Sequence, residues 1–342
     1  MHERNNRGGR AGGGGEVIEM KIKDKNAVKK ILLITLSNIG DIVLTTPVLS
    51  VLRREFSGAA IDVLCGPNGK EIFSDHPFVA DFIMYDKFSK PHLKKGLIRK
   101  LRANRYDLVV DLKNSLLPLL IGARRRTPVI RPIGRAAIHK KDEHLRNLER
   151  LGLYVKDAQF AFYLDADDRN LVLSILADRE VKKDFVVISP GAKSHIKRWT
   201  KEAFASVCDA LIDELGLDIV MAGNRADAGI ISEIKGLMKN KAFDLSGKLS
   251  LRQLGALIER SRLLITNDSA PMHIAHALGA RVLAIFGPTD PKKYGPKGKG
   301  DVIIRKVLAC SPCEAAQCAK NHECMKLISA GEVFEAARKM LI

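Results

Sequence analysis

The sequence predicts an α/β protein built from parallel, doubly wound sheets. Short apolar runs that suit buried strands recur along the chain, and segments with the helical spacing of apolar residues separate them. Strands that alternate with helices form parallel sheets, because each helix carries the chain back to the same edge of the sheet. The 342 residues suffice for two domains of ordinary size, and a hydrophobic content of 46% can supply a core for each.

The clearest strand–helix–strand unit lies in the second half of the chain. Three good N-cap residues, Asn267, Asp268 and Ser269, precede its helix, and Gly279 should end it. The free N–H groups at the start of such a helix lie where the strands end, so we expect a diphosphate to bind there. The unit consists of a strand at 263–265, a helix from about 271 to 278 and a strand at 282–286.

The other predicted elements fall into two halves, with a weaker pattern between about 124 and 168. The first half has strands at 30–36, 60–64, 82–84 and 106–112 and a helix at 39–56; the second adds strands at 185–191, 218–222 and 243–245. We therefore expect two facing Rossmann-like domains, 28–170 and 171–342, after a disordered basic and glycine-rich tail at 1–27. The closing amphipathic helix, 331–342, could pack back across the first domain.

The net charge of +18 is unevenly distributed. Between Lys87 and Lys141 the chain carries 16 basic residues and only two acidic ones. Such a stretch attracts polyanions or an anionic membrane face, although an ordinary solvated surface is the alternative. No apolar stretch approaches the roughly 20 residues of a membrane span, and the first residues lack the apolar centre of a secretion signal. A cytoplasmic protein is expected.

Asp41 is the candidate catalytic base. A strand ends near Leu36, the chain turns at Gly40, and Asp41 stands at the start of the next helix. A carboxylate at a helix N-terminus is often only a cap or a partner of the helix dipole. On the first strand of an α/β domain, however, the same position faces the cleft, so both interpretations stay open.

A second candidate is the loop from Ser189 to Thr200, which contains Gly191 and three cationic residues, Lys193, Lys197 and Arg198. A lysine acts as a point charge on phosphate oxygens, so the loop suits a phosphate clamp. The single tryptophan, Trp199, should also pack this loop onto the core. The spacing is not that of a P-loop.

The helix after Asp268 carries two histidines, His273 and His276, which are neighbours on its surface. No further residue is placed to complete three metal ligands. We expect His273 to contact the ligand near the first turn, together with Asp268, Ser269 and Ala270, and His276 to pack or lie on the surface.

Four cysteines, Cys310, Cys313, Cys318 and Cys324, lie within fifteen residues. Zinc binding and a redox disulfide pair are the chemical interpretations, and a structural loop is the alternative. The spacing is tighter than that of the usual zinc ribbons.

Taken together, these motifs resemble the ADP-heptose:lipopolysaccharide heptosyltransferases of glycosyltransferase family 9. The resemblance rests on segments that occur in the family order: 38–41 followed by Pro47, Gly191 with 197–199, 266–269 with His273, and 286–291. It covers the chain from about residue 30 to its end. It implies a GT-B fold, in which the first of two Rossmann-like domains binds the acceptor and the second binds the nucleotide sugar.

The resemblance also implies a reaction and residue roles. Heptose would pass with inversion from ADP-heptose to the lipopolysaccharide inner core, without a metal or other cofactor. Asp41 matches the general base and Lys197 the lysine on the donor diphosphate. The diphosphate and sugar segment matches Asp268, Ser269 and Ala270, with His273 beside it, and the adenine-side backbone contacts fall at Leu249.

The expected partners follow from the charge and the resemblance. The basic stretch would meet the phosphates and carboxylates of lipid A and Kdo sugars at the cytoplasmic face of the inner membrane. Arg124, Arg125, Arg126 and Arg131 are the candidate acceptor-binding residues. Alternatives are a GT-B transferase or epimerase for another nucleotide sugar, and a nucleic-acid-binding protein. The last is disfavoured because aromatic residues, which stack on bases, make up only 5% of the chain.

Overall fold

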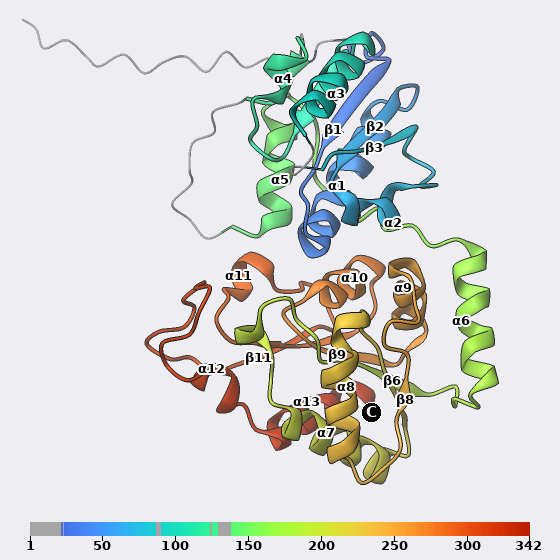
Figure 1. Ribbon diagram of the computed structural model, residues 1–342, viewed down its shortest axis with the longest axis vertical. Coiled ribbons are helices and arrows are strands. Elements are labelled where there is room, and N and C mark those ends of the chain that lie inside the picture. The colour runs from blue at the N-terminus through green and yellow to red at the C-terminus, as the bar shows by residue number, and fades with distance from the viewer. Residues whose placement is uncertain (1–21, 23, 87–89, 124, 129–137) are drawn as a thin grey trace, which may run out of the picture.

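A computed structural model gives the fold of the protein and describes residues 22, 24–86, 90–123, 125–128 and 138–342. Most of the tail expected at 1–27 lies outside these residues, as do Arg124 and Arg131. The chain forms two lobes, one above the other in Figure 1, each built on one parallel sheet. The expected pair of facing α/β units is therefore confirmed.

The first lobe is a five-stranded sheet with helices packed on it. Its strands are β1 (Lys30–Ile34), β2 (Ala60–Cys65), β3 (Asp81–Met84), β4 (Leu108–Asp111) and β5 (Arg125–Arg126). Its helices are α1 (Ile39–Glu55), α2 (Lys70–Phe73), α3 (Pro91–Ala103), α4 (Leu117–Leu120) and α5 (Lys140–Glu149). The strand order is β3-β2-β1-β4-β5, and every pair whose register is defined is parallel.

The second lobe has a six-stranded sheet in the order β11-β10-β9-β6-β7-β8, again with parallel pairs. Its strands are β6 (Phe185–Ser189), β7 (Asp218–Met221), β8 (Phe243–Asp244), β9 (Leu263–Asn267), β10 (Val282–Phe286) and β11 (Val302–Arg305). Its helices are α6 (Ala166–Asp178), α7 (Lys201–Leu215), α8 (Ala228–Leu237), α9 (Leu251–Arg260), α10 (Ala270–Leu278), α11 (Pro291–Tyr294), α12 (Glu323–Lys326) and α13 (Ala330–Leu341).

The central strands explain why apolar runs mark this fold. All residues of β6, β9 and β10 are buried, as expected for parallel strands covered by helices on both faces. The helices between them have definite ends. Ser250 closes a capping box with Gln253 at the start of α9, and Gly279 ends α10 in the left-handed conformation with φ of 71°.

Helix α6 stands beside the second lobe at the connection between the lobes (Figure 1). The expected boundary at residue 170 falls inside this helix, and α6 packs on α9. We place the boundary, as a proposal, before Ala166, because the helix is continuous and its neighbour belongs to the second sheet.

The closing helix does not cross to the first lobe, so that expectation was wrong. Helix α13 packs on α7 and β9 of the second lobe. Its apolar face, with Val333, Phe334 and Ala337, joins the core beneath the second sheet that also contains Trp199. An amphipathic pattern shows that a helix has an apolar face but does not show which neighbour covers it.

Among the described residues, every helix is too short or too polar to cross a lipid bilayer.

Candidate active site

A cavity of about 480 Å³ lies where loops from the two lobes meet. Its walls come from the segments that follow β1 in the first lobe and β6, β9 and β10 in the second, so the carboxyl ends of both sheets open onto it. Ligands of open α/β sheets bind at such edges. The lining residues are Asn38, Gly40, Asp41, Lys193, Ser194, Lys197, Asp268, Ser269, Ala270, His273, Pro288, Thr289, Tyr294, Glu314 and Ala315.

Asp41 lies in the first turn of α1 and lines this cavity half-buried. The amide of Asn38 donates to its carboxylate over 3.0 Å, and the same amide accepts a hydrogen bond from the ammonium of Lys193 over 3.1 Å. Because Lys193 belongs to the other lobe, one amide both orients the Asp41 carboxylate and joins the lobes. Asp41 forms no ion pair within the described part of the chain.

Lys197 contributes a cation from the opposite wall. It ends the 3-10 turn η2 (His195–Lys197), and its ammonium lies 2.7 Å from a carboxylate oxygen of Asp268. The same oxygen accepts a hydrogen bond of 2.6 Å from the hydroxyl of Thr289. Asp268 is only 5% exposed, so these two partners offset the cost of burying its charge. The carboxylate thereby holds the lysine at the start of α10.

His273 lies one helical turn into α10, where its buried side chain lines the cavity. Burial, partly opposed by the carboxylates of Asp268 and Asp41, lowers the pKa of its imidazole to about 4. The ring is therefore neutral near pH 7 and can contact a ligand as a hydrogen-bonding group without adding charge. It lies against Gly40: a Cβ at residue 40 would come within 2.7 Å of the ring carbon Cδ2.

The side chain of Asn267 fixes the cationic loop to the sheet. Its oxygen accepts the backbone N–H of Trp199 over 3.1 Å, and its nitrogen donates to the carbonyl of Pro190 over 2.7 Å. The indole of Trp199 is buried and donates to the carbonyl of Ile328. The expected packing role of Trp199 is confirmed, and the loop that carries Lys197 has a rigid base.

Two predicted donor-site residues lie outside this cavity. Gly191 stands behind the loop, where a Cβ would come within 2.3 Å of the carboxylate of Asp227; its small size serves a close approach of two loops. Leu249 packs at the margin of the core. Any contact of these residues with a donor would lie beyond the 480 Å³ cavity.

The described acceptor-site arginines also lie away from the cavity. Arg125 pairs with Leu108 at the start of β4, whereas the cavity is reached from the carboxyl ends of the strands. It lines another cavity, of about 740 Å³, with Arg102 and Arg105. Arg126 donates to the carbonyl of Ala123.

The four cysteines of the terminal segment are free thiols, Cys310 and Cys313 exposed and Cys324 buried. Burial, and after it the proximity of the other three thiols, raises the pKa of Cys324. They are neighbours, but among the described residues no three His, Cys, Asp or Glu side chains converge as ligands of one metal ion. As they stand, they do not fit a zinc site.

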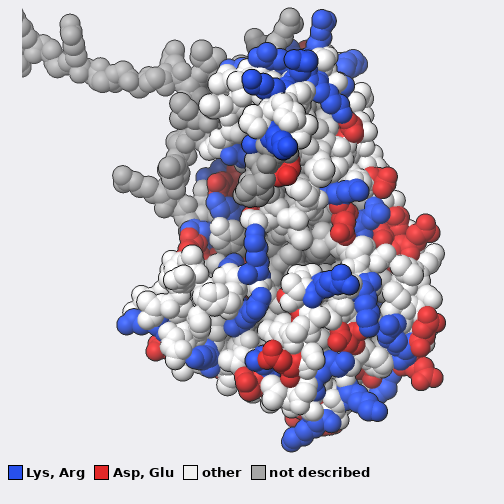
Figure 2. Space-filling view, viewed as in Figure 1, with Lys and Arg blue, Asp and Glu red and all other residues white. Residues whose placement is uncertain are grey.

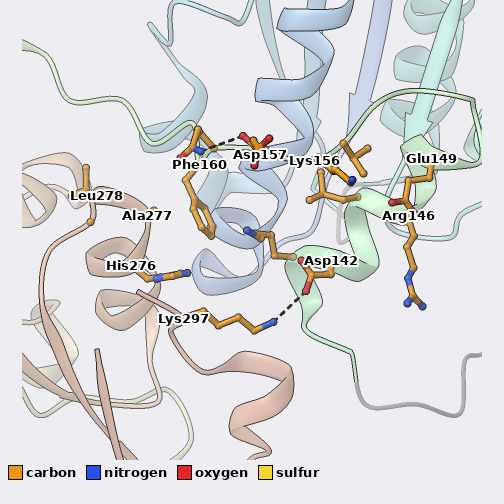
Figure 3. Close-up of a pocket in the computed structure, with 16 residues that line it drawn as sticks. Asp142, Arg146, Glu149, Lys156, Asp157, Phe160, His276, Ala277, Leu278 and Lys297 are labelled. Atoms are coloured by element: carbon orange, nitrogen blue, oxygen red, sulfur yellow. Dashed lines mark hydrogen bonds and ion pairs between the residues drawn. The ribbon is translucent and has the colours of Figure 1, made fainter. Parts of the chain in front are cut away.

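A second cavity between the lobes, of about 810 Å³, lies between α5 and the end of α10 (Figure 3). Lys297 pairs there with Asp142 across the lobes at 3.2 Å. His276 packs edge-to-face on Phe160 and has its Nδ1 3.3 Å from Asp301, so its expected packing role is confirmed. The lining carries charges of both signs and none of the predicted site residues.

Sequence reasoning missed several residues that line the 480 Å³ cavity. Asn38 and Thr289 belong to the segments that carry the family resemblance, but their roles depend on partners far along the chain, Lys193 and Asp268. Lys193 itself was expected in the phosphate clamp, and it binds Asn38 of the other lobe. Tyr294 and Glu314 belong to segments without any pattern of their own. Their only signal in the sequence is their place after strands that end at the cleft.

The arrangement has the parts of a group-transfer site. One lobe offers a carboxylate, and the other offers a lysine and a helix N-terminus, which together suit a phosphorylated leaving group. An acceptor hydroxyl bound beside Asp41 would face that leaving group across the cavity.

Comparison with known proteins agrees with this chemistry. Residues 119–323 match glycosyltransferase family 9 (heptosyltransferase). The chain is 30% identical to lipopolysaccharide heptosyltransferase 3 of Escherichia coli (strain K12), over 88% of this chain and 95% of that protein.

Two solved structures share the fold over nearly the whole chain. The family 9 glycosyltransferase of Veillonella parvula DSM 2008 has a TM-score of 0.80 at 24% identity, covering 95% of this chain and 98% of that one. The ADP-heptose lps heptosyltransferase II of E. coli has a TM-score of 0.76 at 22% identity, covering 91% and 98%. These matches confirm the expected GT-B-type fold. The chain therefore belongs to glycosyltransferase family 9, the heptosyltransferase family, and is a glycosyltransferase.

Proposed function

We propose that this enzyme transfers L-glycero-D-manno-heptose from ADP-heptose to the inner core of lipopolysaccharide, with inversion at the anomeric carbon. The observation that carries the proposal is the cavity in which Asp41 of one lobe faces Lys197 and the start of α10 of the other. The substrate class comes from the relatives, which are lipopolysaccharide heptosyltransferases.

On the donor side, Lys197 and the first N–H groups of α10 hold the diphosphate. Lys197 is already fixed by Asp268, so little side-chain freedom is lost when the donor binds. Ser269, Ala270 and His273 line the wall beside it. As ADP leaves, the lysine and the helix dipole stabilise the charge that develops on its phosphate.

On the acceptor side, Asp41 accepts the proton of the attacking hydroxyl. Inversion is a single displacement: the acceptor oxygen forms a bond to the anomeric carbon while the bond to the diphosphate oxygen breaks. One base is enough for this step, and the Asn38 amide aims the Asp41 carboxylate at the cavity.

We propose that the outer parts of both substrates contact residues beyond the 480 Å³ cavity. We keep Gly191 and Leu249 as candidate donor contacts and the arginines at 124–126 and 131 as candidate acceptor contacts. Arg125 lies in β5, beside the first residue of β4. An acceptor that contacts it must therefore extend well beyond the 480 Å³ cavity.

The direct test is a comparison of donors. The purified enzyme and heptose-deficient lipopolysaccharide are incubated in separate reactions with ADP-heptose, a UDP-sugar or a GDP-sugar. Mass spectrometry of the product identifies the sugar added, and NMR spectroscopy identifies its anomeric configuration. We expect one heptose to be added from ADP-heptose alone, with the anomeric configuration inverted. Consumption of another nucleotide sugar in its place, or epimerisation without an acceptor, would refute the proposal.

A further inference from the structure

The segment with the four cysteines supplies part of the wall of the 480 Å³ cavity through Glu314. The N–H of this residue donates to the carbonyl of Pro288 over 2.8 Å. Earlier in the segment, the hydroxyl of Ser311 donates to the carbonyl of Gly287 over 2.6 Å. Both carbonyls belong to the loop after β10, whose next residue, Thr289, lines the same cavity. Glu314 is therefore fixed to a loop of the proposed donor site.

The backbone of Glu314 has a φ of 50°, in the left-handed region that residues other than glycine seldom adopt. Such strained residues persist where the contacts around them fix the backbone, and they cluster at ligand-binding sites. The ion pair of Glu314 with Lys293 leaves its side chain 39% exposed, and an exposed ion pair stabilises a fold only slightly. The strain therefore points to a ligand of the Glu314 carboxylate rather than to a purely structural ion pair.

Lys293 orients this carboxylate without occupying all of it. Its ammonium, which comes from α11, donates to both carboxylate oxygens of Glu314, over 2.9 and 2.8 Å. An ionised carboxylate offers about four acceptor positions, so about two remain for a ligand. A carboxylate beside an ammonium suits hydroxyl groups, because a hydroxyl can donate to the carboxylate and accept from the ammonium.

The charge of Glu314 restricts which part of a donor it can contact. A carboxylate repels phosphates, and the proposed function places the diphosphate at Lys197 and the start of α10. Figure 2 shows acidic and basic side chains close together where the two lobes meet, so this region is not a uniformly cationic surface. Glu314 therefore suits an uncharged, hydroxyl-bearing part of the substrate.

The ring of Tyr294, which also lines the cavity, relates Glu314 to the proposed base. Burial, and after it the charges of Asp41 and Glu314, raise the pKa of the Tyr294 phenol, so both carboxylates lie near this ring. In a single displacement, the sugar lies between the base and the leaving diphosphate. Glu314 and Asp41 thus border the part of the cavity that the sugar would occupy.

We propose that the carboxylate of Glu314 accepts hydrogen bonds from hydroxyl groups of the sugar that is transferred. The inference deepens the proposed function and rests on it, since it concerns the sugar of the same donor. Lys293 holds the carboxylate in place for this contact. A site that binds a substrate hydroxyl in this way discriminates against a sugar that lacks the hydroxyl. The cysteine segment would then contribute to the choice of sugar.

The test compares the dissociation constants of ADP and of ADP-heptose, measured by titration calorimetry in the absence of an acceptor. Glu314→Asn is the variant of choice, because asparagine also adopts the left-handed conformation but has a shorter, uncharged side chain. We expect this variant to bind ADP-heptose roughly tenfold more weakly than the wild type does, the effect of losing one hydrogen bond to a charged group. Its affinity for ADP, which lacks the transferred sugar, should equal that of the wild type.

The matched control is Glu323→Gln, which neutralises an exposed carboxylate of the same segment outside the cavity lining. It should bind both ligands like the wild type, and both variants should keep the wild-type midpoint of urea unfolding. Two results for Glu314→Asn would overturn the inference: wild-type affinity for ADP-heptose, or equal weakening of ADP and ADP-heptose, which would mean that the residue acts on the diphosphate clamp. A failure of the proposed function would appear in the wild type, which would then transfer no heptose from ADP-heptose.

Discussion

Asp41 is only half-buried, and the side-chain amide of Asn38 orients its carboxylate. Asn38 donates to the carboxylate and accepts from Lys193 of the other lobe, so the amide oxygen and nitrogen are both occupied. If the side-chain amide of Asn38 were turned by 180°, its nitrogen would face the ammonium of Lys193 and its oxygen would face the carboxylate of Asp41. The lobe contact thus decides how the proposed base is presented to the cavity.

Asp41→Asn should abolish most of the turnover while leaving the donor site intact. An amide of the same shape still accepts from Asn38 but cannot take up a proton, so kcat should fall about 10²–10⁴-fold, the usual worth of a general base. The control is Asp75→Asn, an exposed carboxylate of the same lobe in a left-handed backbone position that asparagine also adopts. Steady-state kinetics and calorimetric binding of ADP measure the two effects. Wild-type turnover in the Asp41 variant would exclude this residue as the base.

Lys197→Ala should weaken ADP binding roughly 10- to 100-fold, the range expected for hydrogen bonds to charged groups. Thr289 still donates to Asp268 in this variant, but the buried carboxylate loses its cation and then faces the phosphates directly. Lys201→Ala, which removes an exposed lysine paired with Glu233, is the control. Titration calorimetry measures the dissociation constant of ADP for each variant. A value for Lys197→Ala equal to that of the wild type would exclude the phosphate clamp.

At the residue level, the sequence identified residues of one cavity where local chemistry and position agree, and their roles stay predictions. Asp41, Lys197 and His273 follow strands that end at the cleft, and the structure brings them into one cavity. For Arg125 composition alone was the guide. Its strand pairs with the start of β4, and this register cannot be read from the sequence of β5.

At the scale of elements, the loop that carries Lys197 is shaped by a close approach between two turns. The carboxylate of Asp227 accepts the N–H of Asn224 and closes the 3-10 turn η3 (Arg225–Asp227). Gly191 lies against this carboxylate, and a Cβ on residue 191 would overlap it. The turn after β7 therefore limits where the cationic loop can lie.

Gly191→Ala should destabilise the protein by about 1–3 kcal/mol, as overpacking in a well-packed region usually does, and should weaken ADP binding because the loop must shift. Gly229→Ala is the matched control. It lies in α8 with open space around it, and alanine favours a helix over glycine by up to about 1 kcal/mol. In denaturant unfolding, the midpoint should be lower than that of the wild type for Gly191→Ala and higher for Gly229→Ala. Equal midpoints would show that the two loops can move apart freely.

The elements that the sequence predicted best are the buried strands and the helices that follow them. The weaker pattern from about 124 to 168 has a physical cause. Helix α5 buries only four of its ten residues, two of them polar, so its periodicity is faint. The edge strand β11 is half-buried along its length and lacks the continuous apolar run of β9 or β10. Tertiary contacts, more than local pattern, fix both elements.

At the scale of the whole molecule, a neutral histidine joins the two lobes. The Nδ1 of His139, at the start of α5, accepts the N–H of Lys141, while its Nε2 lies 3.0 Å from the carbonyl of Gly295 in the second lobe. Only the tautomer with its hydrogen on Nε2 satisfies both partners. Burial, and after it the nearby ammonium of Lys297, lowers the pKa of His139 to about 4, because a charged imidazole would lack solvation.

This arrangement predicts a loss of stability in acid. Burial lowers the pKa of His139 and of His273 to about 4, and also lowers that of His76, below the ordinary value of 6.5. Between about pH 4 and pH 6.5 the unfolded chain binds more protons than the folded one. The free energy of unfolding therefore falls as the pH drops through this range. Urea midpoints measured across this range should show the decline.

His139→Gln should flatten that decline by up to about 1.4 kcal/mol per pH unit, the linkage expected for one proton. The exposed His92→Gln is the control and should leave the slope unchanged. A stability that is constant from neutral pH down to about pH 4 would contradict the assignment of buried, neutral histidines.

The contact between Gly40 and His273 has a consequence for how the enzyme moves. An added methyl group at residue 40 would sit 2.7 Å from a carbon of the imidazole, well inside the roughly 3.5–4.0 Å of a comfortable contact. We expect holding the lobes apart to relieve the strain, because α10 packs on α9, β9 and β10 of its own lobe as well as on α1 of the other. Gly40→Ala would then keep the lobes apart. The variant should still bind the nucleotide, but the two lobes could not close around the acceptor.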